Sequence, residues 1–375
     1  MISFWEKKEL LSYDLVVLGG GITGMFCALS YRESFPKASI AILERGLFSS
    51  GASTKNAGFA CFGSLTELIE DIEQMNESEV YKIIQMRLEG LSLLRKTLGD
   101  KNLDIKFNGG YELFFDKNSE VIDKIDYVNS FLKPIFSKQV FKFNNSKINE
   151  FGFDSNKVKF IIENKLEGQI NTGKMMRSLR GKVNMENIDF FSNTTLEKFE
   201  IQNDQKLLTL NLKKEEFKLS CKKLAICNNA FVNQILPNSN IIPGRGLIII
   251  SKPMKNLKIK GSFHYEKGYY YFRNIDNRIL LGGGRNMDMD VEKTTQFGIN
   301  QTIKNKLLND INQFILPKEK FNIEMEWSGI MAFGKNKIPI VRRENQYTAI
   351  GVKLGGMGIA IGSLIGKKVS DLLIE

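Results

Sequence analysis

The chain has 375 residues, a formal net charge of +11, 42% hydrophobic residues and 25% charged residues. This composition excludes wholesale disorder and supplies enough apolar residues for one large domain or two medium ones. The N-terminal segment mixes acidic and basic residues and no apolar run reaches membrane-spanning length, so we expect a cytoplasmic protein without a secretory signal or transmembrane segment.

Histidine and cysteine usage limits the chemistry that side chains alone can perform. The single histidine is His264, and the four cysteines show no Cys-x-x-Cys spacing. Disulfides, metal sites and histidine-based nucleophilic relays are therefore disfavoured, and we predict no metal and a structural or surface role for His264. The lysines are spread along the chain and form no dense basic block, so we expect no nucleic-acid partner. A bound cofactor should carry the reaction.

The first fifty residues predict a βαβ unit. Residues 14–18 read as a buried strand, 22–34 as a helix and 38–43 as a second strand. Between the first two lies G-x-G-x-x-G, formed by Gly19, Gly21 and Gly24. In this motif the glycines allow a tight turn, close approach of a pyrophosphate and close helix–strand packing, while the helix N-terminus attracts the phosphates.

The end of the second strand narrows the choice of nucleotide. Glu44 lies twenty positions beyond Gly24, where a carboxylate accepts hydrogen bonds from an adenosine ribose and repels a 2′-phosphate. The unit therefore predicts FAD or NAD rather than NADP, with a strand–turn–helix that binds no ligand as the alternative. The βαβ unit alone does not separate FAD from NAD.

The rest of the chain alternates between helical and strand-rich blocks. Capping boxes predict helices over 65–74 and 77–98. Short strands follow from 109, a helix follows the turn near 171, and 224–231 reads as a buried strand ending in a polar turn. A second strand-rich block precedes an amphipathic helix that carries Ile303, Leu307, Ile311 and Phe314, and the last fifty residues return to strand, glycine turn and helix.

This alternation predicts an α/β fold with a discontinuous Rossmann-like nucleotide domain of the glutathione-reductase type and an inserted β-rich α+β substrate domain. We assign residues 1–100, 151–240 and 326–375 to the nucleotide domain. We assign residues 101–150 and 241–325 to the substrate domain.

Three segments resemble the FAD-dependent oxidoreductases of the D-amino-acid oxidase and glycine oxidase family. They are VVLGGGITGMFCAL, GASTKNAGFACFGS and GVKLGGMGIAIGSLIGKKVSDLL, which match the nucleotide fingerprint, the loop after the second strand and the C-terminal flavin-binding turn and helix. PGRGLIII, RILLGGGR and WSGIMAFGKNKIPIV resemble further family segments, so the likeness extends over nearly the whole chain.

The resemblance implies non-covalent FAD, because the corresponding C-terminal segments contain no histidine or cysteine. It also implies hydride transfer from a carbon that bears an amine, followed by hydrolysis of the imine. The cofactor-binding residues that we predict are Gly19, Gly21, Ile22, Thr23, Gly24, Glu44, Arg45, Ser53, Thr54, Asn56, Ala57, Gly58, Asn228, Gly355, Gly356, Met357 and Gly358.

The strand GYYYFRN supplies candidates for the substrate site. Alternation would place Tyr271 and Arg273 on one face, where an aromatic wall with a cation suits a small anionic substrate, although such residues also serve plain packing. Arg285 and Lys353 complete the predicted catalytic set. The family's carboxylate-binding arginine is replaced by Met331, which leaves Lys335, Lys337 or Lys353 as sources of charge or points to a different amine.

The expected function is therefore oxidation of a small amine or amino acid, with oxygen or an unknown electron acceptor. Two alternatives remain open at this point. One is a NAD-dependent dehydrogenase, which would need neither the second nor the third family segment. The other is a flavin-binding module without amine oxidase activity, of the kind found in tRNA modification.

Overall fold

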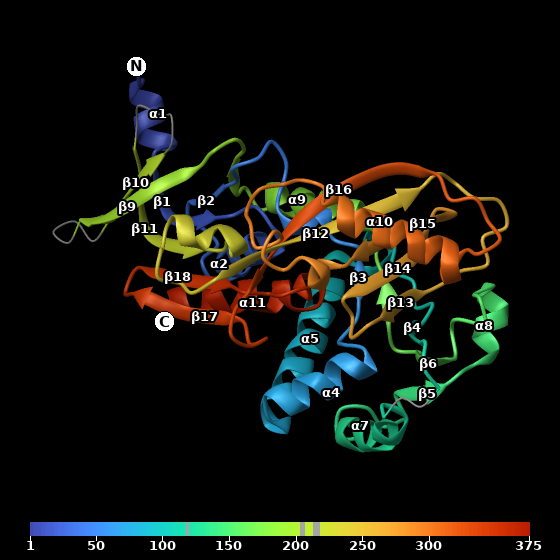
Figure 1. Ribbon diagram of the computed structural model, residues 1–375. Helices are drawn as coiled ribbons and strands as arrows, with labels where there is room; N and C mark the ends of the chain where they lie inside the picture. Colours follow the sequence, from blue (N-terminus) through green and yellow to red (C-terminus); the bar gives the residue numbers. More distant parts are fainter. Residues whose placement is uncertain (118–119, 203–206, 213–217) are drawn as a thin grey trace.

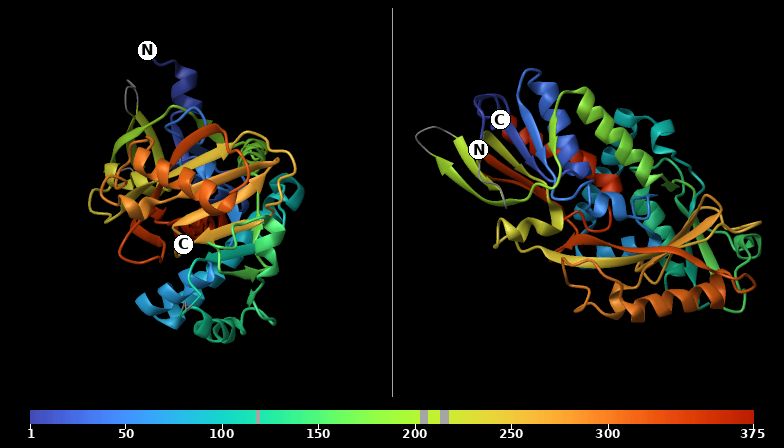
Figure 2. Two further views of the ribbon diagram at one scale, coloured as in Figure 1. Left: turned by 45° about the vertical axis from the view of Figure 1, so that its right-hand side comes forward. Right: turned by 90° about the horizontal axis from the view of Figure 1, so that it is seen from above.

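The computed structural model describes residues 1–117, 120–202, 207–212 and 218–375, and it contains two eight-stranded sheets. Figures 1 and 2 show the first sheet near the two chain termini and the second at the opposite end of the molecule. Among the described residues, no helix is both long enough and apolar enough to cross a membrane.

The first sheet has a parallel centre with the order β18-β11-β1-β2-β8. The bounds of these strands are Thr348–Val352, Lys218–Ile226, Ser12–Leu18, Ile40–Leu43 and Asp189–Phe191. Antiparallel strands β17 (Ile340–Asn345), β10 (Leu207–Leu212) and β9 (Leu196–Gln202) extend it. Leu15, Val16 and Val17 are fully buried because layers of structure cover both faces, as parallel sheets require.

Helices cover one face of this sheet. They are α2 (Ile22–Ser34), α5 (Glu77–Leu98), α9 (Thr172–Met185) and α11 (Gly358–Ile374). The absence of side chains at Gly362 and Gly366 lets α11 approach α2 closely, since added Cβ atoms there would contact Ile22 and the backbone of Thr23. This packing brings both helix N-termini to the same place, near the carboxyl ends of the parallel strands.

The second sheet has the order β16-β12-β15-β14-β13-β4-β6-β5. Its strands span Ile323–Phe333, Ile242–Ser251, Arg278–Gly283, Tyr270–Ile275, Ser262–Tyr265, Gly110–Phe114, Phe160–Asn164 and Phe141–Phe143. One face packs on α10 (Gln301–Asp310) and α8 (Ser146–Phe151) through a core rich in stacked aromatic rings, such as Phe263 and Phe272. The other face is turned toward the nucleotide-type domain.

The remaining elements are shorter. The helices are α1 (Phe4–Glu9), α3 (Ala52–Lys55), α4 (Leu65–Gln74), α6 (Asp100–Leu103) and α7 (Ile125–Leu132), with 3₁₀ turns at Ile122–Lys124, Asn229–Gln234 and Arg285–Met287. A two-stranded ribbon joins β3 (Phe59–Ala60) to β7 (Gly168–Gln169).

Most predicted elements occur where the sequence places them. The helices over 65–74 and 77–98 are confirmed, and Ser64 and Glu67 form the expected capping box. The strand predicted over 224–231 ends at Ile226 and gives way to a 3₁₀ turn. The helix through Phe314 is shorter than predicted, because α10 ends at Asp310 and continues as a π-helical turn over Ile311–Ile315.

Two strands lie in a different sheet from the one that the predicted domain limits imply. Strand β6 falls within 151–240, and most of β16 falls within 326–375, yet both pair in the second sheet. The reason is that β16 pairs along its full length with β12, from Ser251↔Ile323 to Ile242↔Phe333. A strand's own sequence does not specify its partner.

Candidate active site

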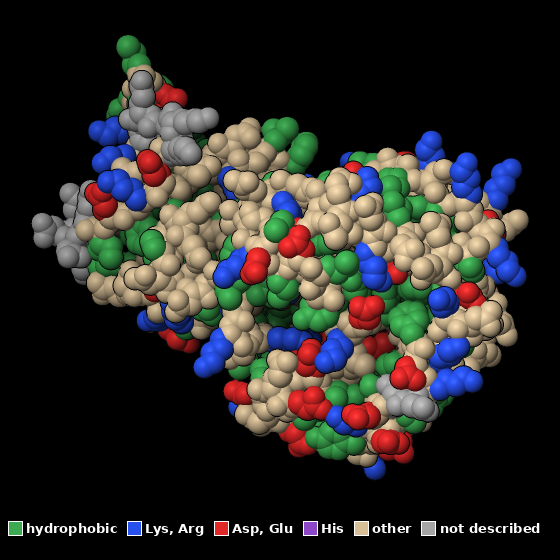
Figure 3. All heavy atoms as spheres, in the orientation of Figure 1, with side chains coloured by type: hydrophobic (Ala, Val, Ile, Leu, Met, Phe, Trp, Pro, Cys, Tyr) green, Lys and Arg blue, Asp and Glu red, His purple; other side chains and the backbone are tan. Residues whose placement is uncertain are grey.

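A cavity of about 630 Å³ lies between the two sheets and extends from the first βαβ unit to the inner face of the second sheet. Its volume is within the range of about 300–1,000 Å³ that is common for ligand sites. In Figure 3 the molecular surface is hollowed near its centre, with hydrophobic side chains inside and charged side chains of both signs below. All but three of the predicted site residues border the cavity; the exceptions are Gly24, Thr54 and Arg273.

The glycine loop forms the first end of the cavity. A Cβ at Gly24 would clash with the carbonyl oxygen of Gly19, so this glycine serves helix–strand packing and lies behind the cavity wall. A Cβ at Gly21 would stand 2.8 Å from the Ser53 hydroxyl oxygen, and a larger side chain would enter the cavity. The Ile22 amide already donates to Ser53 Oγ at 3.0 Å, so it is engaged within the loop.

Glu44 is buried at the same end and is held in place by the loops around it. Its Oε2 accepts from the Gly20 amide at 3.1 Å, and its Oε1 accepts from the Gly46 amide at 2.9 Å and from Ser50 Oγ at 3.0 Å. The carboxylate is therefore fixed and retains lone pairs for ribose hydroxyls. Next to it, the Arg45 guanidinium lies 3.4 Å from the Phe231 ring centroid, and burial lowers its pKa.

The loop over 51–58 uses its polar side chains to hold its own backbone. Thr54 Oγ1 donates to the Ser49 carbonyl at 2.5 Å and is exposed outside the cavity. Asn56 donates to the carbonyls of Ala52 and Ser53, and its Oδ1 accepts from the Gly58 amide at 2.8 Å. Asn56 therefore borders the cavity as part of the loop's internal framework.

Arg273 does not reach the cavity. Its Nη1 donates to the carbonyl oxygens of Ala57, Gly58 and Ile170 at 3.0, 2.8 and 2.8 Å. Tyr271 and Arg273 lie on one face of β14 as predicted, but the arginine is two residues further along and meets the loop backbone. Burial lowers its pKa to about 10. Its position indicates a structural clamp rather than a substrate ligand.

The second sheet supplies the other wall of the cavity. His264 on β13 and Tyr271 on β14 both pack edge-on against Phe59, with ring centroids 5.1 and 5.6 Å apart. Burial raises the pKa of Tyr271 to about 12, so its hydroxyl stays protonated and able to donate. Met331 on β16 lies against Gly246 on the cavity side of the sheet, where the family pattern would have an arginine.

Two of the predicted cationic side chains, Lys353 and Arg285, border the cavity and differ in their contacts. Lys353 has a left-handed backbone with φ of 66°, and its Nζ donates to Asn336 Oδ1 at 2.8 Å, while burial lowers its pKa. Arg285 lies over the Phe333 ring at 4.1 Å, and no carboxylate of the described residues forms an ion pair with it. Burial also lowers the pKa of Arg285, and this desolvated cation suits a small anion.

His264 is neither exposed nor isolated, which fits the structural rather than the surface role expected from the sequence, and it borders the cavity. It is 6% exposed and stands beside Glu112 in the β13–β4 register. Burial lowers the pKa of His264, but the nearby carboxylates of Glu167, Glu67 and Glu112 outweigh burial and raise the pKa to about 9. Burial raises the pKa of Glu112 to about 7. No local sequence motif indicates that His264 lies close to Glu67, Glu112 and Glu167.

Several features of the residues that line the cavity fit FAD. Asn228 Oδ1 borders it, is buried, and has no hydrogen-bond partner among the described residues. Added Cβ atoms at Gly355 and Gly356 would meet nothing within 4 Å, so space is open in front of α11. Two helix N-termini beside a glycine cradle favour a pyrophosphate and the negative charge of a reduced flavin.

Comparison with solved structures shows which proteins share this fold. Glycine oxidase from Geobacillus kaustophilus superposes with a TM-score of 0.77 at 16% identity, covering 97% of this chain and 95% of that one. L-proline dehydrogenase from P. horikoshii gives 0.75 at 16% identity, covering 97% and 93%. L-alpha-glycerophosphate oxidase from Mycoplasma pneumoniae, solved with FAD bound, gives 0.76 at 13% identity, covering 97% and 95%.

Sequence comparison supplies the family. No curated protein sequence matches the chain. The family model described as DAO, FAD dependent oxidoreductase, matches residues 14–372, which is nearly the whole chain. The chain therefore belongs to the DAO family of FAD-dependent oxidoreductases.

Proposed function

We propose that this protein oxidises a small amine or amino acid at the carbon that bears the nitrogen, using FAD. The observation that carries the proposal is one continuous cavity, which has a nucleotide-type glycine loop at one end and a polar and aromatic wall at the other. The glycine oxidase and the L-proline dehydrogenase that share the fold act on amino acids, as their names state. Family membership favours FAD over NAD.

The proposed roles of the residues follow from their positions. Gly19, Gly21 and the amides that follow Ile22 at the start of α2 would hold the pyrophosphate, Glu44 the ribose, and the turn over 355–358 the flavin ring. The flavin, when bound, supplies the hydride acceptor, and the imine left on the substrate is hydrolysed by water. Arg285 would bind a substrate carboxylate, while the Tyr271 hydroxyl would donate a hydrogen bond.

The chemistry can be tested through its products. The holoenzyme is incubated with a panel of amines, amino alcohols and D- and L-amino acids and an artificial electron acceptor, and ammonia, carbonyl product and reduced acceptor are measured. We expect a substrate for which the carbonyl product and the reduced acceptor appear in equal amounts. Flavin-loaded protein that forms no such product with any compound would support a flavin-binding module without amine oxidase activity.

Arg285→Met is expected to weaken the use of a carboxylate-bearing substrate. Loss of a charge-assisted hydrogen bond costs about 1.5–3 kcal/mol, so kcat/KM should fall by about 10- to 150-fold. Methionine keeps much of the apolar contact with Phe333. Steady-state kinetics on an amino acid and on the matching amine without a carboxylate would measure the effect.

Arg278→Met is the matched control, because Arg278 lies on β15 outside the cavity and pairs with Glu324. The role of Arg285 is excluded if its variant affects both substrates equally, or if the control lowers kcat/KM as much.

We also propose that the FAD is dissociable and that the enzyme is cytoplasmic. The turn and helix over 353–375 contain no cysteine or histidine. Acid precipitation should leave the flavin in the supernatant, whereas a yellow precipitate would indicate a covalent bond. Cell fractionation would test the location.

A further inference from the structure

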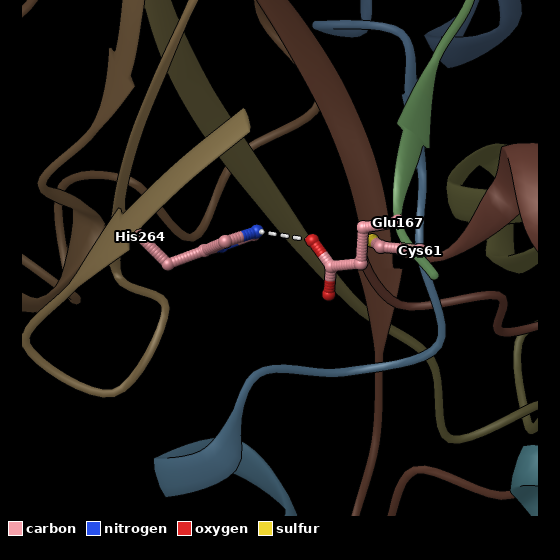
Figure 4. Close-up of side chains that lie close together, drawn as sticks. All are labelled: Cys61, Glu167 and His264. Carbon is pink, nitrogen blue, oxygen red and sulfur yellow. Dashed lines mark ion pairs between the residues drawn. The ribbon is translucent and has the colours of Figure 1, made fainter. Parts of the chain in front are cut away.

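Three side chains from distant parts of the chain meet beside the cavity. They are Cys61, just after β3, Glu167, just before β7, and His264 on β13, and all three are buried. Each offers one ligand atom, and these atoms lie within 4.8 Å of one another. Figure 4 shows His264 directed toward the Glu167 carboxylate with Cys61 beside it. The reaction proposed above uses none of the three.

The spacing of the imidazole and the carboxylate is that of two ligands of one metal ion. His264 Nε2 lies 3.5 Å from Glu167 Oε2, and neither atom has a hydrogen-bond partner among the described residues. This distance is long for a direct hydrogen bond. Two ligands that bind tetrahedral zinc at about 2.0–2.2 Å are themselves separated by about 3.3–3.6 Å.

Strand pairing, rather than a local sequence motif, brings the three side chains of the cluster together. The β3–β7 ribbon pairs Phe59 with Gln169 and Ala60 with Gly168, so Cys61 comes opposite Glu167 at the next position. The Glu167 carboxylate occupies space that only glycine leaves free, since a Cβ at Gly110 would clash with its Oε2.

We propose that Cys61, Glu167 and His264 bind one Zn²⁺ ion. Thiolate, carboxylate and imidazole are all zinc ligands, and the two anionic groups neutralise the ion. On binding, the Cys61 thiol proton and the proton on the His264 ring nitrogen that faces Glu167 leave, and the three side chains adjust so that their ligand atoms reach bonding distance.

The fourth coordination position of the proposed site faces the cavity. Cys61 and His264 both border the cavity, whereas Glu167 lies behind them. Cys61 Sγ is 3.9 Å from the Met357 sulfur, in the turn before α11. Three protein ligands with one open position are typical of zinc sites that exchange a water or a small ligand rather than closed structural sites.

The first test is metal content. The FAD-loaded full chain is stripped with a chelator, incubated with Zn²⁺ and desalted, and zinc and flavin are quantified together. We expect one zinc per chain, and a loss of at least tenfold in Cys61→Ser and His264→Gln. Cys221→Ser, at a buried cysteine in the other sheet's core, should retain zinc. Equal zinc in the unmodified chain and Cys61→Ser, or equal loss in the control, would overturn the site.

The second test needs no substitution and therefore does not depend on the variants folding. Co²⁺ replaces Zn²⁺ in the stripped holoenzyme, and absorption is recorded at wavelengths longer than the flavin bands. A tetrahedral cobalt spectrum that Zn²⁺ abolishes on addition would support the site. A spectrum identical to that of hydrated Co²⁺ would refute it. Neither result depends on which substrate the enzyme oxidises.

Discussion

Gly21→Leu is expected to fold but to purify without its yellow cofactor. A Cβ at this position would stand 2.8 Å from Ser53 Oγ, and the rest of a leucine side chain would fill the space in which the pyrophosphate is proposed to lie. We expect the dissociation constant for FAD to rise at least about a thousandfold, equivalent to about 4 kcal/mol. Titration of the stripped protein with FAD, followed by flavin fluorescence, measures this change.

Two further variants make the result specific. Gly21→Ala should retain much of the affinity, because the Ser53 hydroxyl can rotate away from a single methyl group. Gly181→Leu places the same side chain on α9, where an added Cβ meets nothing within 4 Å, and should bind FAD normally. If correctly folded Gly21→Leu keeps a full complement of FAD, the phosphates do not lie at this loop.

Arg273→Met is expected to destabilise the protein by about 3–5 kcal/mol. The change removes one buried cation and leaves the carbonyls of Ala57, Gly58 and Ile170 without the donor that they share. Arg273→Lys should lose less, since an ammonium can still donate to part of this set. Urea unfolding at saturating FAD, with the midpoint and slope compared, gives the free energies.

This substitution also separates the two roles considered for Arg273. From the sequence pattern alone, Arg273 is predicted to bind the substrate. In the structure its guanidinium instead holds the backbone of the loop over 51–58. A variant with unchanged unfolding free energy but a greatly raised KM would favour the substrate role. Arg278→Met, at a half-buried position on the protein surface, should change stability by no more than about 0.5 kcal/mol.

The fold was predictable where local signals act within a short stretch of chain. The G-x-G-x-x-G loop, the alternation of strand and helix, and the capping residues Ser64 and Asn76 all report on their immediate neighbours. The sheet to which β6 and β16 belong was not predictable in this way. The strands with which they pair lie up to about a hundred residues away along the chain, and a strand's own side chains do not determine which strand it pairs with.

The site residues were likewise predictable where they belong to a local sequence motif. Gly21 and Glu44 occupy positions that the motif itself defines, and both border the cavity. Arg273 and Tyr271 share the alternation that the sequence shows, but only the three-dimensional path of the loop determines which of them reaches the cavity. The cluster of Cys61, Glu167 and His264 joins three segments about a hundred residues apart, so no spacing rule reveals it.

Anaerobic reduction of the bound flavin tests the central claim most directly. The holoenzyme is mixed without oxygen with each member of a panel of amines and D- and L-amino acids, and the visible flavin absorbance is followed. We predict rapid bleaching by one chemical group of these compounds, with bleaching by its carboxylate-bearing members slowed in Arg285→Met. A fully FAD-loaded protein that stays yellow with every amine and amino acid, and is bleached only by a compound without a carbon–nitrogen bond to oxidise, would contradict it.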